Sequence, residues 1–247
     1  MAAKLSPEET RRYARHLVLK GMGGAGQQKL KAARALVIGA GGLGSPVIAY
    51  LAAAGIGMLG VIDDDEVALS NLQRQIVHGM GDLGRSKAAS AGDFVASLNP
   101  HVAFRAQVER LDQGNAAILL DGYDLVLDGS DNFETRLAVA EAAEAVNLPL
   151  VSGAVSMFDG QVTVFAPHLP RPDGGRNPRF RDLYPETPSP DELPSCEAVG
   201  VIGAATGVIG TLMAMEAIKL LTGIGNPLIG RLLLYDGRAA RFTELAY

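Results

Sequence analysis

Apolar runs alternate with helical stretches between residues 34 and about 155. Four of the apolar runs are typical of strands buried on both faces of a sheet; they cover residues 35–38, 59–62, 125–127 and 148–151. Helical patterns lie between them, at about 43–54, 86–98, 112–121 and 132–146. This alternation predicts βαβ units in an α/β fold, with a Rossmann-like, mostly parallel sheet and helices on both faces.

The pattern changes after residue 155. A strand, a long helix and a terminal antiparallel hairpin are predicted there, over residues 161–165, about 197–222, and 232–235 with 240–245. Residues 167–194 hold eight of the thirteen prolines. Such a composition does not favour regular structure, so we expect a long, mobile crossover loop over about 167–195. The whole chain, 1–247, is expected to form a single domain.

The amino terminus has the pattern of a helix start rather than of a signal peptide. Ser6 is a suitable N-cap, Pro7 suits the first helical position, and Glu9 can close a capping box.

Residues 198–215 carry no formal charge over a length close to that needed to cross a bilayer. No aromatic belt or Lys/Arg cluster adjoins this stretch, which is rich in glycine and alanine. We therefore expect a buried helix and no membrane partner. Gly203, Gly207 and Gly210 would let another backbone approach closely, for example across a subunit interface.

Composition narrows the classes of protein. The formal net charge of −5 argues against a nucleic-acid binder or a polybasic membrane anchor, and 48% hydrophobic residues exclude a disordered chain. Cys196 is the one cysteine, so neither an intrachain disulfide nor a multi-cysteine zinc site can form. A reducing, cytoplasmic compartment is expected.

A glycine-rich turn follows the first predicted strand. Gly39-Ala40-Gly41-Gly42-Leu43-Gly44 matches G-x-G-x-x-G and opens a helix, where glycines let a phosphate approach backbone N–H groups. Asp63 ends the next strand, where a carboxylate can accept ribose hydroxyls. Together these features indicate an adenine nucleotide, but they do not separate NAD from ATP.

Two cations beyond the second strand favour a triphosphate. Arg74 lies in the segment Ser70-Asn71-Leu72-Gln73-Arg74-Gln75, and Lys87 begins the next helical stretch. A dinucleotide pyrophosphate is served by the glycine turn alone, so these side chains indicate more negative charge than two phosphates carry. The alternative for Lys87 alone is a solvated lysine in a first helical turn.

Two carboxylates end the strand at 125–127, where ligands bind in open α/β sheets. They are Asp128 and Asp131. Near a polyphosphate, an aspartate such as Asp131 is a natural Mg²⁺ ligand. The alternative is that Asp131 only N-caps the helix that begins near Phe133.

With these segments the chain resembles the MoeB/ThiF/HesA family, the bacterial relatives of ubiquitin-activating enzymes. The matching features cover nearly the whole chain; they are residues 12–15, the glycine turn, Asp63, residues 70–75, Lys87, residues 131–132, 153–162 and 214–219. Within the family, the chain is most similar to the molybdopterin-synthase adenylyltransferases, with the thiamine-pathway ThiF type second.

The resemblance implies ATP- and Mg²⁺-dependent adenylation of the C-terminal glycine of a small ubiquitin-like sulfur carrier, MoaD- or ThiS-like and ending in Gly-Gly. Asp63 would bind the ribose, Asn71, Arg74 and Lys87 the phosphates, and Asp131 the Mg²⁺. Arg15 would reach the triphosphate from the partner subunit of a homodimer. The implied nucleotide contacts are Gly41, Gly42, Asp63, Ser70, Asn71, Leu72, Gln73, Arg74, Lys87, Asp131 and Asn132.

This reaction requires no general base. A terminal carboxylate has a pKa near 3.5 and is already ionised at neutral pH. The site must therefore only align that carboxylate with the α-phosphorus and stabilise the departing pyrophosphate, for which cations and a metal suffice. The four histidines, His16, His78, His101 and His168, are scattered among different elements and are assigned no role.

The chain departs from the family in its cysteines. Many members carry two Cys-x-x-Cys pairs that bind a structural zinc, whereas residues 167–194 hold no cysteine and the sequence stops at Tyr247. Zinc is therefore expected to be absent and the crossover loop less ordered. Cys196 matches a cysteine that bonds covalently to the carrier in some relatives; burial as a small apolar residue is the alternative.

Two other classes of protein remain open. A nicotinamide-dependent oxidoreductase is supported only by the glycine turn and Asp63, and it leaves Arg74, Lys87 and Asp131 unexplained. A catalytically inert scaffold that dimerises through its glycine-rich helix is disfavoured by the apparently complete set of polar residues.

Overall fold

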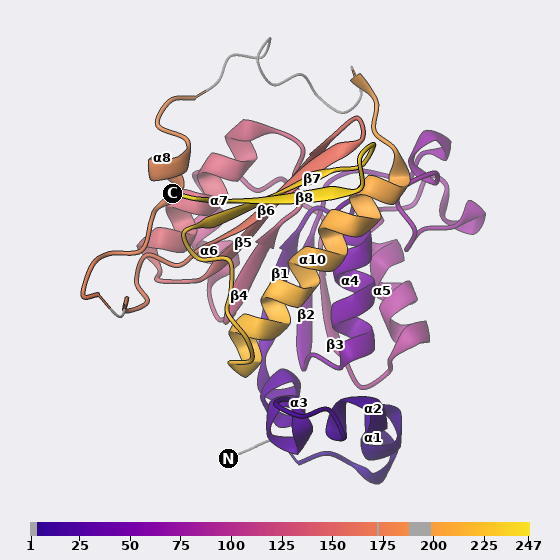
Figure 1. The fold of residues 1–247 in the computed structure, drawn as a ribbon. Coiled ribbons are helices and arrows are strands. Elements are labelled where there is room, and N and C mark those ends of the chain that lie inside the picture. The colour runs from indigo at the N-terminus through magenta and orange to yellow at the C-terminus, as the bar shows by residue number, and fades with distance from the viewer. Residues whose placement is uncertain (1–3, 172, 188–198) are drawn as a thin grey trace.

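The computed structural model describes residues 4–171, 173–187 and 199–247. Its centre is an eight-stranded sheet with the strand order β3-β2-β1-β4-β5-β6-β7-β8 (Figure 1). The first five strands along the chain pair in parallel, and β6 to β8 add antiparallel strands at one side. The strands are β1 (Arg34–Ile38), β2 (Met58–Ile62), β3 (Ala103–Gln107), β4 (Leu125–Asp128), β5 (Leu150–Ser156), β6 (Asp159–Phe165), β7 (Arg231–Asp236) and β8 (Arg241–Ala246). The predicted fold class is confirmed.

Helices cover both faces of this sheet (Figure 1). The helices on one face are α4 (Gly44–Ala54), α5 (Lys87–Leu98) and α10 (Gly203–Thr222); those on the other are α6 (Ala116–Leu120), α7 (Phe133–Ala145) and α8 (Phe180–Leu183). Alternate residues of β1 belong to the two cores, Ala35 and Val37 to one and Leu36 and Ile38 to the other. Burial on both faces explains why this strand is apolar throughout.

The elements with strong apolar runs were predicted within a few residues, and one strand was missed. β3 lies at the edge of the sheet and is largely exposed, so its sequence has no apolar run to mark it. The capping box is confirmed, with Glu9 N–H donating to Ser6 Oγ (3.1 Å) and Ser6 N–H to Glu9 Oε2 (2.7 Å).

The long uncharged segment forms α10, which packs on α4, β5 and β6. By length and composition alone, α10 could cross a membrane. Its glycines serve contacts inside the chain: a Cβ on Gly210 would lie 2.3 Å from Pro46 Cγ, and one on Gly203 would lie 2.4 Å from the carbonyl oxygen of Gln73. The expected close approach of another backbone is therefore confirmed at these two glycines, and the approaching segments belong to α4 and residues 73–74 of the same chain rather than to a second subunit.

The described part of the crossover segment contains regular structure. Helix α8 places Phe180 against Phe165, Phe133 and Tyr184, and Phe180 is 5% exposed. The preceding Asn177 donates through its side chain to the carbonyl oxygens of Ala166 (3.2 Å) and Leu169 (2.8 Å). The expectation of a segment without regular structure is thus wrong for α8, where aromatic packing stabilises one helical turn, while residues 173–179 and 184–187 form neither helix nor strand.

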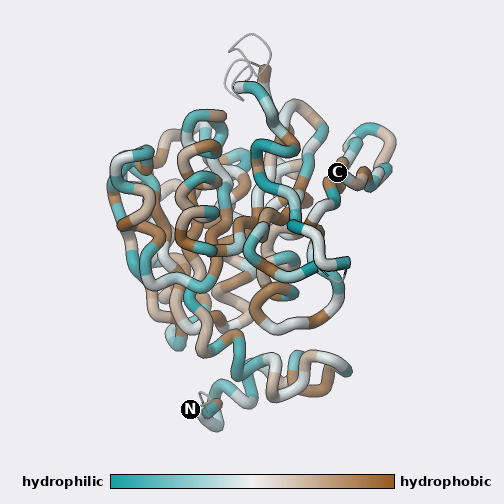
Figure 2. The backbone as a smooth tube through the Cα atoms, turned by 90° about the vertical axis from the view of Figure 1, so that its left-hand side faces the viewer, coloured by the Kyte–Doolittle hydropathy of each residue, from teal (hydrophilic) through white to brown (hydrophobic). Residues whose placement is uncertain are grey.

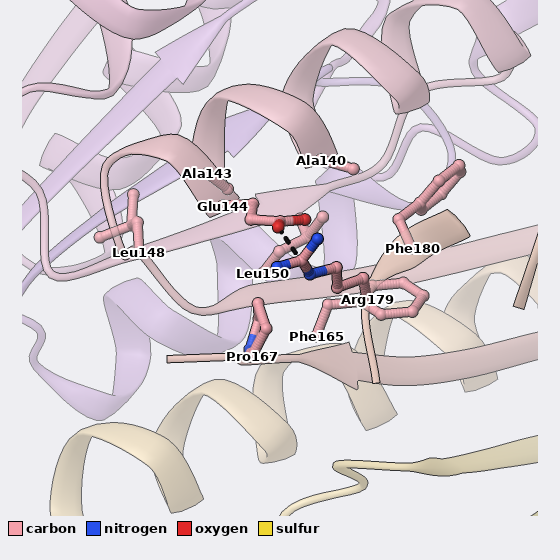
Figure 3. A pocket seen from close by; sticks show the side chains of 9 residues that line it. All are labelled: Ala140, Ala143, Glu144, Leu148, Leu150, Phe165, Pro167, Arg179 and Phe180. Carbon is pink, nitrogen blue, oxygen red and sulfur yellow. Dashed lines mark ion pairs between the residues drawn. The ribbon is translucent and has the colours of Figure 1, made fainter. Parts of the chain in front are cut away.

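An ion pair closes the outer side of this contact. Arg179 Nε lies 2.8 Å from Glu144 Oε1 of α7, above a small cavity lined by Leu148, Leu150 and Phe165 (Figure 3). With a volume of about 10 Å³, this cavity has room for no more than a water molecule. It is therefore a packing defect and not the predicted nucleotide site.

Three further helices, α1 (Pro7–Arg12), α2 (Ala14–Leu17) and α3 (Gly23–Ala32), lie at one end of the molecule (Figures 1 and 2). Tyr13 joins them to the C-terminal end of α4, since a Cβ on Gly55 would lie 2.3 Å from its hydroxyl oxygen. Asn99 Nδ2 donates to that hydroxyl (2.9 Å), and Arg12 Nη1 donates to the carbonyl oxygen of Leu98 at the end of α5 (3.0 Å). These contacts fix the helices at the end of α4 and α5 remote from the glycine turn.

Candidate active site

The glycine turn joins β1 to α4 at the carboxyl edge of the parallel strands. Gly39 has φ +85°, and a Cβ on Gly44 would lie 1.8 Å from the carbonyl oxygen of Gly39. Both positions therefore require glycine. In the described part of the chain, the N–H groups of Gly41 and Gly42 have no hydrogen-bond acceptor. Free N–H groups at the start of a helix are the donors that an anion requires.

Asp63 connects the end of β2 to this turn. Its Oδ2 accepts from the N–H of Ala40 (2.7 Å) and its Oδ1 from the N–H of Asp65 (2.9 Å). Burial raises the pKa of Asp63 above its ordinary value, and the nearby charge of Lys87 acts in the opposite direction. Each carboxylate oxygen keeps a further lone pair, so the predicted acceptor of ribose hydroxyls stands beside the glycine turn.

Lys87 is the first residue of α5 and is 6% exposed. Its Nζ lies 2.6 Å from Asp65 Oδ2, while the Asp65 side chain is 66% exposed. The alternative of a solvated lysine is therefore wrong. A buried ammonium group whose single carboxylate partner is largely in solvent can exchange or share that partner with a phosphate.

Arg74 lies against the glycine turn, with its Cδ 3.4 Å from the position of a Cβ on Gly42. The backbone that carries Arg74 is folded by η1 (Leu69–Asn71), where Asn71 Oδ1 accepts from the N–H of Ala68 (3.1 Å). Arg74 Nη1 donates to the carbonyl oxygen of Ser70 (3.0 Å), which leaves its other N–H groups available. Of the remaining predicted contacts in this segment, Ser70 and Gln73 are exposed and Leu72 is half-buried.

The loop after β4 adjoins the same turn, since a Cβ on Gly129 would lie 3.2 Å from the backbone nitrogen of Gly44. Asp131 is exposed on this loop, and the N-cap of α7 is Asn132, whose Oδ1 accepts from the N–H of Thr135 (2.9 Å). The alternative that Asp131 caps this helix is therefore wrong. Its carboxylate is free to serve as the single protein ligand that a nucleotide-bound Mg²⁺ commonly has.

Asp128 holds this loop instead. It is fully buried, and its Oδ1 accepts from both the N–H (3.0 Å) and the hydroxyl (2.6 Å) of Ser130. Arg136 Nη2 donates to the carbonyl oxygen of the same serine (2.8 Å). Burial raises the pKa of Asp128 above its ordinary value. Arg136 was missed in the sequence because nothing local links it to residue 130.

A second set of carboxylates lies close by. Within residues 4–171, 173–187 and 199–247, the acidic side chains near enough to share a metal ion are Asp63, Asp64 and Asp65, whose ligand atoms lie within 4.8 Å of one another. Asp131 is not among them. Exposed acidic groups often cluster without a metal, and Asp65 is already paired with Lys87.

One predicted site residue, Arg15, is not brought to the turn. Arg15 is exposed on α2, beside the contacts that fix α1 to α3 at the remote end of α4. Cys196 lies outside the described residues. Thr206, which nothing in the sequence singled out, lies over the glycine turn: its Cγ2 is 3.1 Å from the position of a Cβ on Gly42. Such a contact from α10 depends on tertiary packing and has no local signal.

The chain is similar in sequence to proteins of a known family. Residues 13–247 match the model of the ThiF family. The Mycobacterium tuberculosis protein named "Probable adenylyltransferase/sulfurtransferase MoeZ" is 50% identical over 235 residues, which are 95% of this chain and 59% of MoeZ. The chain thus spans less than two thirds of that relative. The "Sulfur carrier protein adenylyltransferase" of Thermus thermophilus is 48% identical over 96% of this chain and 87% of its own length.

Solved structures agree on the fold. E. coli MccB with MccA-N7isoASN aligns with a TM-score of 0.83 at 19% identity, covering 98% of this chain and 72% of that chain. This likeness concerns the fold alone. The family match over residues 13–247, together with two relatives near 50% identity, shows that the chain belongs to the ThiF family.

Proposed function

We propose that this protein adenylates the C-terminal carboxylate of a small ubiquitin-like sulfur-carrier protein, using ATP and Mg²⁺. The observation that carries the proposal is the convergence of Arg74, Lys87 and Asp63 on a glycine turn with free N–H groups. Membership of a family with relatives named as adenylyltransferases supports it. A nicotinamide-dependent oxidoreductase would not explain the presence of Arg74 and Lys87 beside the turn.

The chemistry follows from charge. The carrier's carboxylate oxygen forms a bond to the α-phosphorus while the bond to pyrophosphate breaks, and no proton needs to be removed first. The N–H groups of Gly41 and Gly42 bind phosphate oxygens, and Asp63 accepts from the ribose. Arg74 and Lys87 stabilise the charge that moves onto pyrophosphate. Asp131 would hold Mg²⁺, which neutralises part of the phosphate charge when bound.

The substrate is proposed from the relatives' names. The Thermus thermophilus relative is named for a sulfur carrier, and MoeZ for adenylyltransferase and sulfurtransferase activities. The proposal for this chain is a MoaD-like carrier ending in Gly-Gly that serves molybdenum-cofactor synthesis. A ThiS-like carrier of thiamine synthesis is the alternative within the same reaction class. A cytoplasmic location goes with either pathway.

A homodimer is also proposed, because one chain cannot bring Arg15 to its own glycine turn. Apolar side chains are exposed near both places: Val18 (80%) follows Arg15, and Ile76 (62%) and Met80 (67%) follow Arg74. In a twofold dimer, the apolar surface around Val18 of each subunit can cover the surface around Ile76 and Met80 of the other. Such an arrangement would bury both apolar patches and place Arg15 of one subunit at the glycine turn of the next.

The test is carrier-dependent exchange of labelled pyrophosphate into ATP. Arg74→Ala and Lys87→Ala should each slow exchange by about 10²–10³-fold, as loss of a charge-stabilising donor does elsewhere. Arg105→Ala, on the exposed face of β3, is the matched control and should exchange like the wild type. No exchange by the wild-type protein with either carrier, or full exchange by Lys87→Ala, would refute the proposal.

A further inference from the structure

A buried histidine holds the glycine turn from behind. His78 is 7% exposed and lies in the segment between Arg74 and Lys87, far along the chain from the turn. Its Nε2 lies 3.0 Å from the carbonyl oxygen of Ala40, and its Nδ1 lies 2.8 Å from Ser90 Oγ of α5. Sequence analysis assigned this histidine no role, because the contact joins residues 38 positions apart.

The carbonyl of Ala40 fixes the proton on one nitrogen of the ring. A backbone carbonyl can only accept, so Nε2 must carry a proton and donate to Ala40. In the neutral ring Nδ1 is then an acceptor, and the hydroxyl of Ser90 supplies its proton. Burial lowers the pKa of His78 below its ordinary value, which is consistent with the neutral form.

Both backbone polar groups of Ala40 are therefore hydrogen-bonded to side chains. Its N–H donates to Asp63 Oδ2 (2.7 Å), and its carbonyl accepts from His78 (3.0 Å). Ser45 Oγ contributes only a long contact of 3.4 Å to the same carbonyl. The peptide that Ala40 forms with Gly41 carries the first free N–H of the turn, so its orientation sets the direction of that donor.

We propose that His78 is a positioning residue for the nucleotide phosphates: by binding the carbonyl of Ala40, it holds the N–H of Gly41 toward them. This inference rests on the proposed function, because it assigns the phosphates of ATP to the turn. His78 does not touch the nucleotide; it acts through the Ala40–Gly41 peptide. The same design recurs in the loop after β4, where Asp128 and Arg136 hold Ser130.

Three variants distinguish the contributions of the two ring nitrogen atoms of His78. In His78→Gln, the side-chain amide nitrogen can replace Nε2 and donate to Ala40. In His78→Asn, the shorter amide can satisfy Ser90 but does not reach Ala40. His78→Leu removes both interactions while keeping an apolar side chain of similar bulk. The dissociation constants for ATP and for adenosine, which lacks phosphates, are measured for each variant together with hydrogen exchange of residues 39–44.

His78→Leu and His78→Asn should weaken ATP binding by about tenfold, the effect of leaving one buried carbonyl unsatisfied. Adenosine binding should change by less than about twofold. Hydrogen exchange should accelerate at Gly39 and Ala40, whose N–H groups are bonded to Ile62 and Asp63. His78→Gln should restore both properties. Equal losses for ATP and adenosine, or unchanged exchange in His78→Leu, would overturn the inference. If the wild type binds no ATP, the proposed function fails, and hydrogen exchange still decides whether His78 orients the turn.

Discussion

Mixing two inactive variants tests whether the active site is shared between subunits. Arg15→Ala removes the arginine expected from the partner, and Lys87→Ala removes the lysine of the subunit's own site. In a mixed dimer, the Arg15→Ala subunit keeps Lys87 and receives Arg15 from its partner, so one complete site is rebuilt. The other site of that dimer lacks both residues.

The structure gives the reason for expecting such sharing. Arg15 is fixed near the C-terminal end of α4, whose 11 residues rise by about 16 Å along the axis. Lys87 is the first residue of α5, while Arg12 is bound to the carbonyl oxygen of Leu98 at the end of that helix. Arg15 lies near the C-terminal ends of α4 and α5, whereas the glycine turn of the same chain lies near their N-terminal ends. This separation is longer than an arginine side chain can reach.

The assay is carrier-dependent pyrophosphate exchange after subunit exchange. Random reassortment of equal amounts makes about half of the dimers mixed, each with one complete site of two, so about a quarter of wild-type activity should return. Each variant alone should retain less than about 1%. Without reassortment, the mixture should stay inactive, which is the control. A fully reassorted mixture with no activity would refute the shared site, and an active Arg15→Ala protein would remove Arg15 from the mechanism.

Three further predictions concern stability and metal content. Gly44→Ala should lower the free energy of unfolding in urea by about 3 kcal/mol, because its Cβ would lie 1.8 Å from the carbonyl oxygen of Gly39. Gly207→Ala, with no atom within 4 Å of its Cβ, should instead gain up to about 1 kcal/mol; equal effects at the two sites would contradict the packing argument. Since burial lowers the pKa of His78, the unfolded chain binds this proton more readily; the wild type should therefore lose stability as the pH falls below about 6.5, and His78→Gln should lose less. A parallel pH dependence in both proteins would argue against that assignment. Finally, elemental analysis should find well under one zinc per chain, whereas stoichiometric zinc would refute its predicted absence.

Several features of this protein could be predicted from local sequence. Strands buried on both faces require continuous apolar runs, so β1, β2 and β4 were evident. The turn after β1 requires glycine at Gly39 and Gly44 for reasons of backbone geometry, and this requirement leaves a readable spacing. Asp63, Arg74 and Lys87 could be predicted as candidate site residues because charged side chains near the ends of parallel strands are conspicuous against an apolar background.

Other features depend on contacts between distant segments. The edge strand β3 has no buried run, and the packing of α8 on Phe165 and Phe133 could not be foreseen among prolines. The ion pair of Lys87 with Asp65 could not be predicted either, because it forms only when the segment after β2 meets the start of α5.

Sequence alone therefore determined which residues carry charge to the carboxyl edge of the sheet, since strand burial and glycine geometry act over a few neighbouring positions. Only the tertiary structure decided how the loops at that edge are held. Ala40 is bound by Asp63 and His78, and Ser130 by Asp128 and Arg136. Tertiary structure also decided that Arg15 lies at the end of the molecule that is remote from the glycine turn of the same chain. Hydrogen bonds to backbone N–H and carbonyl groups leave no pattern in the sequence, because nearly every residue offers the same donor and acceptor.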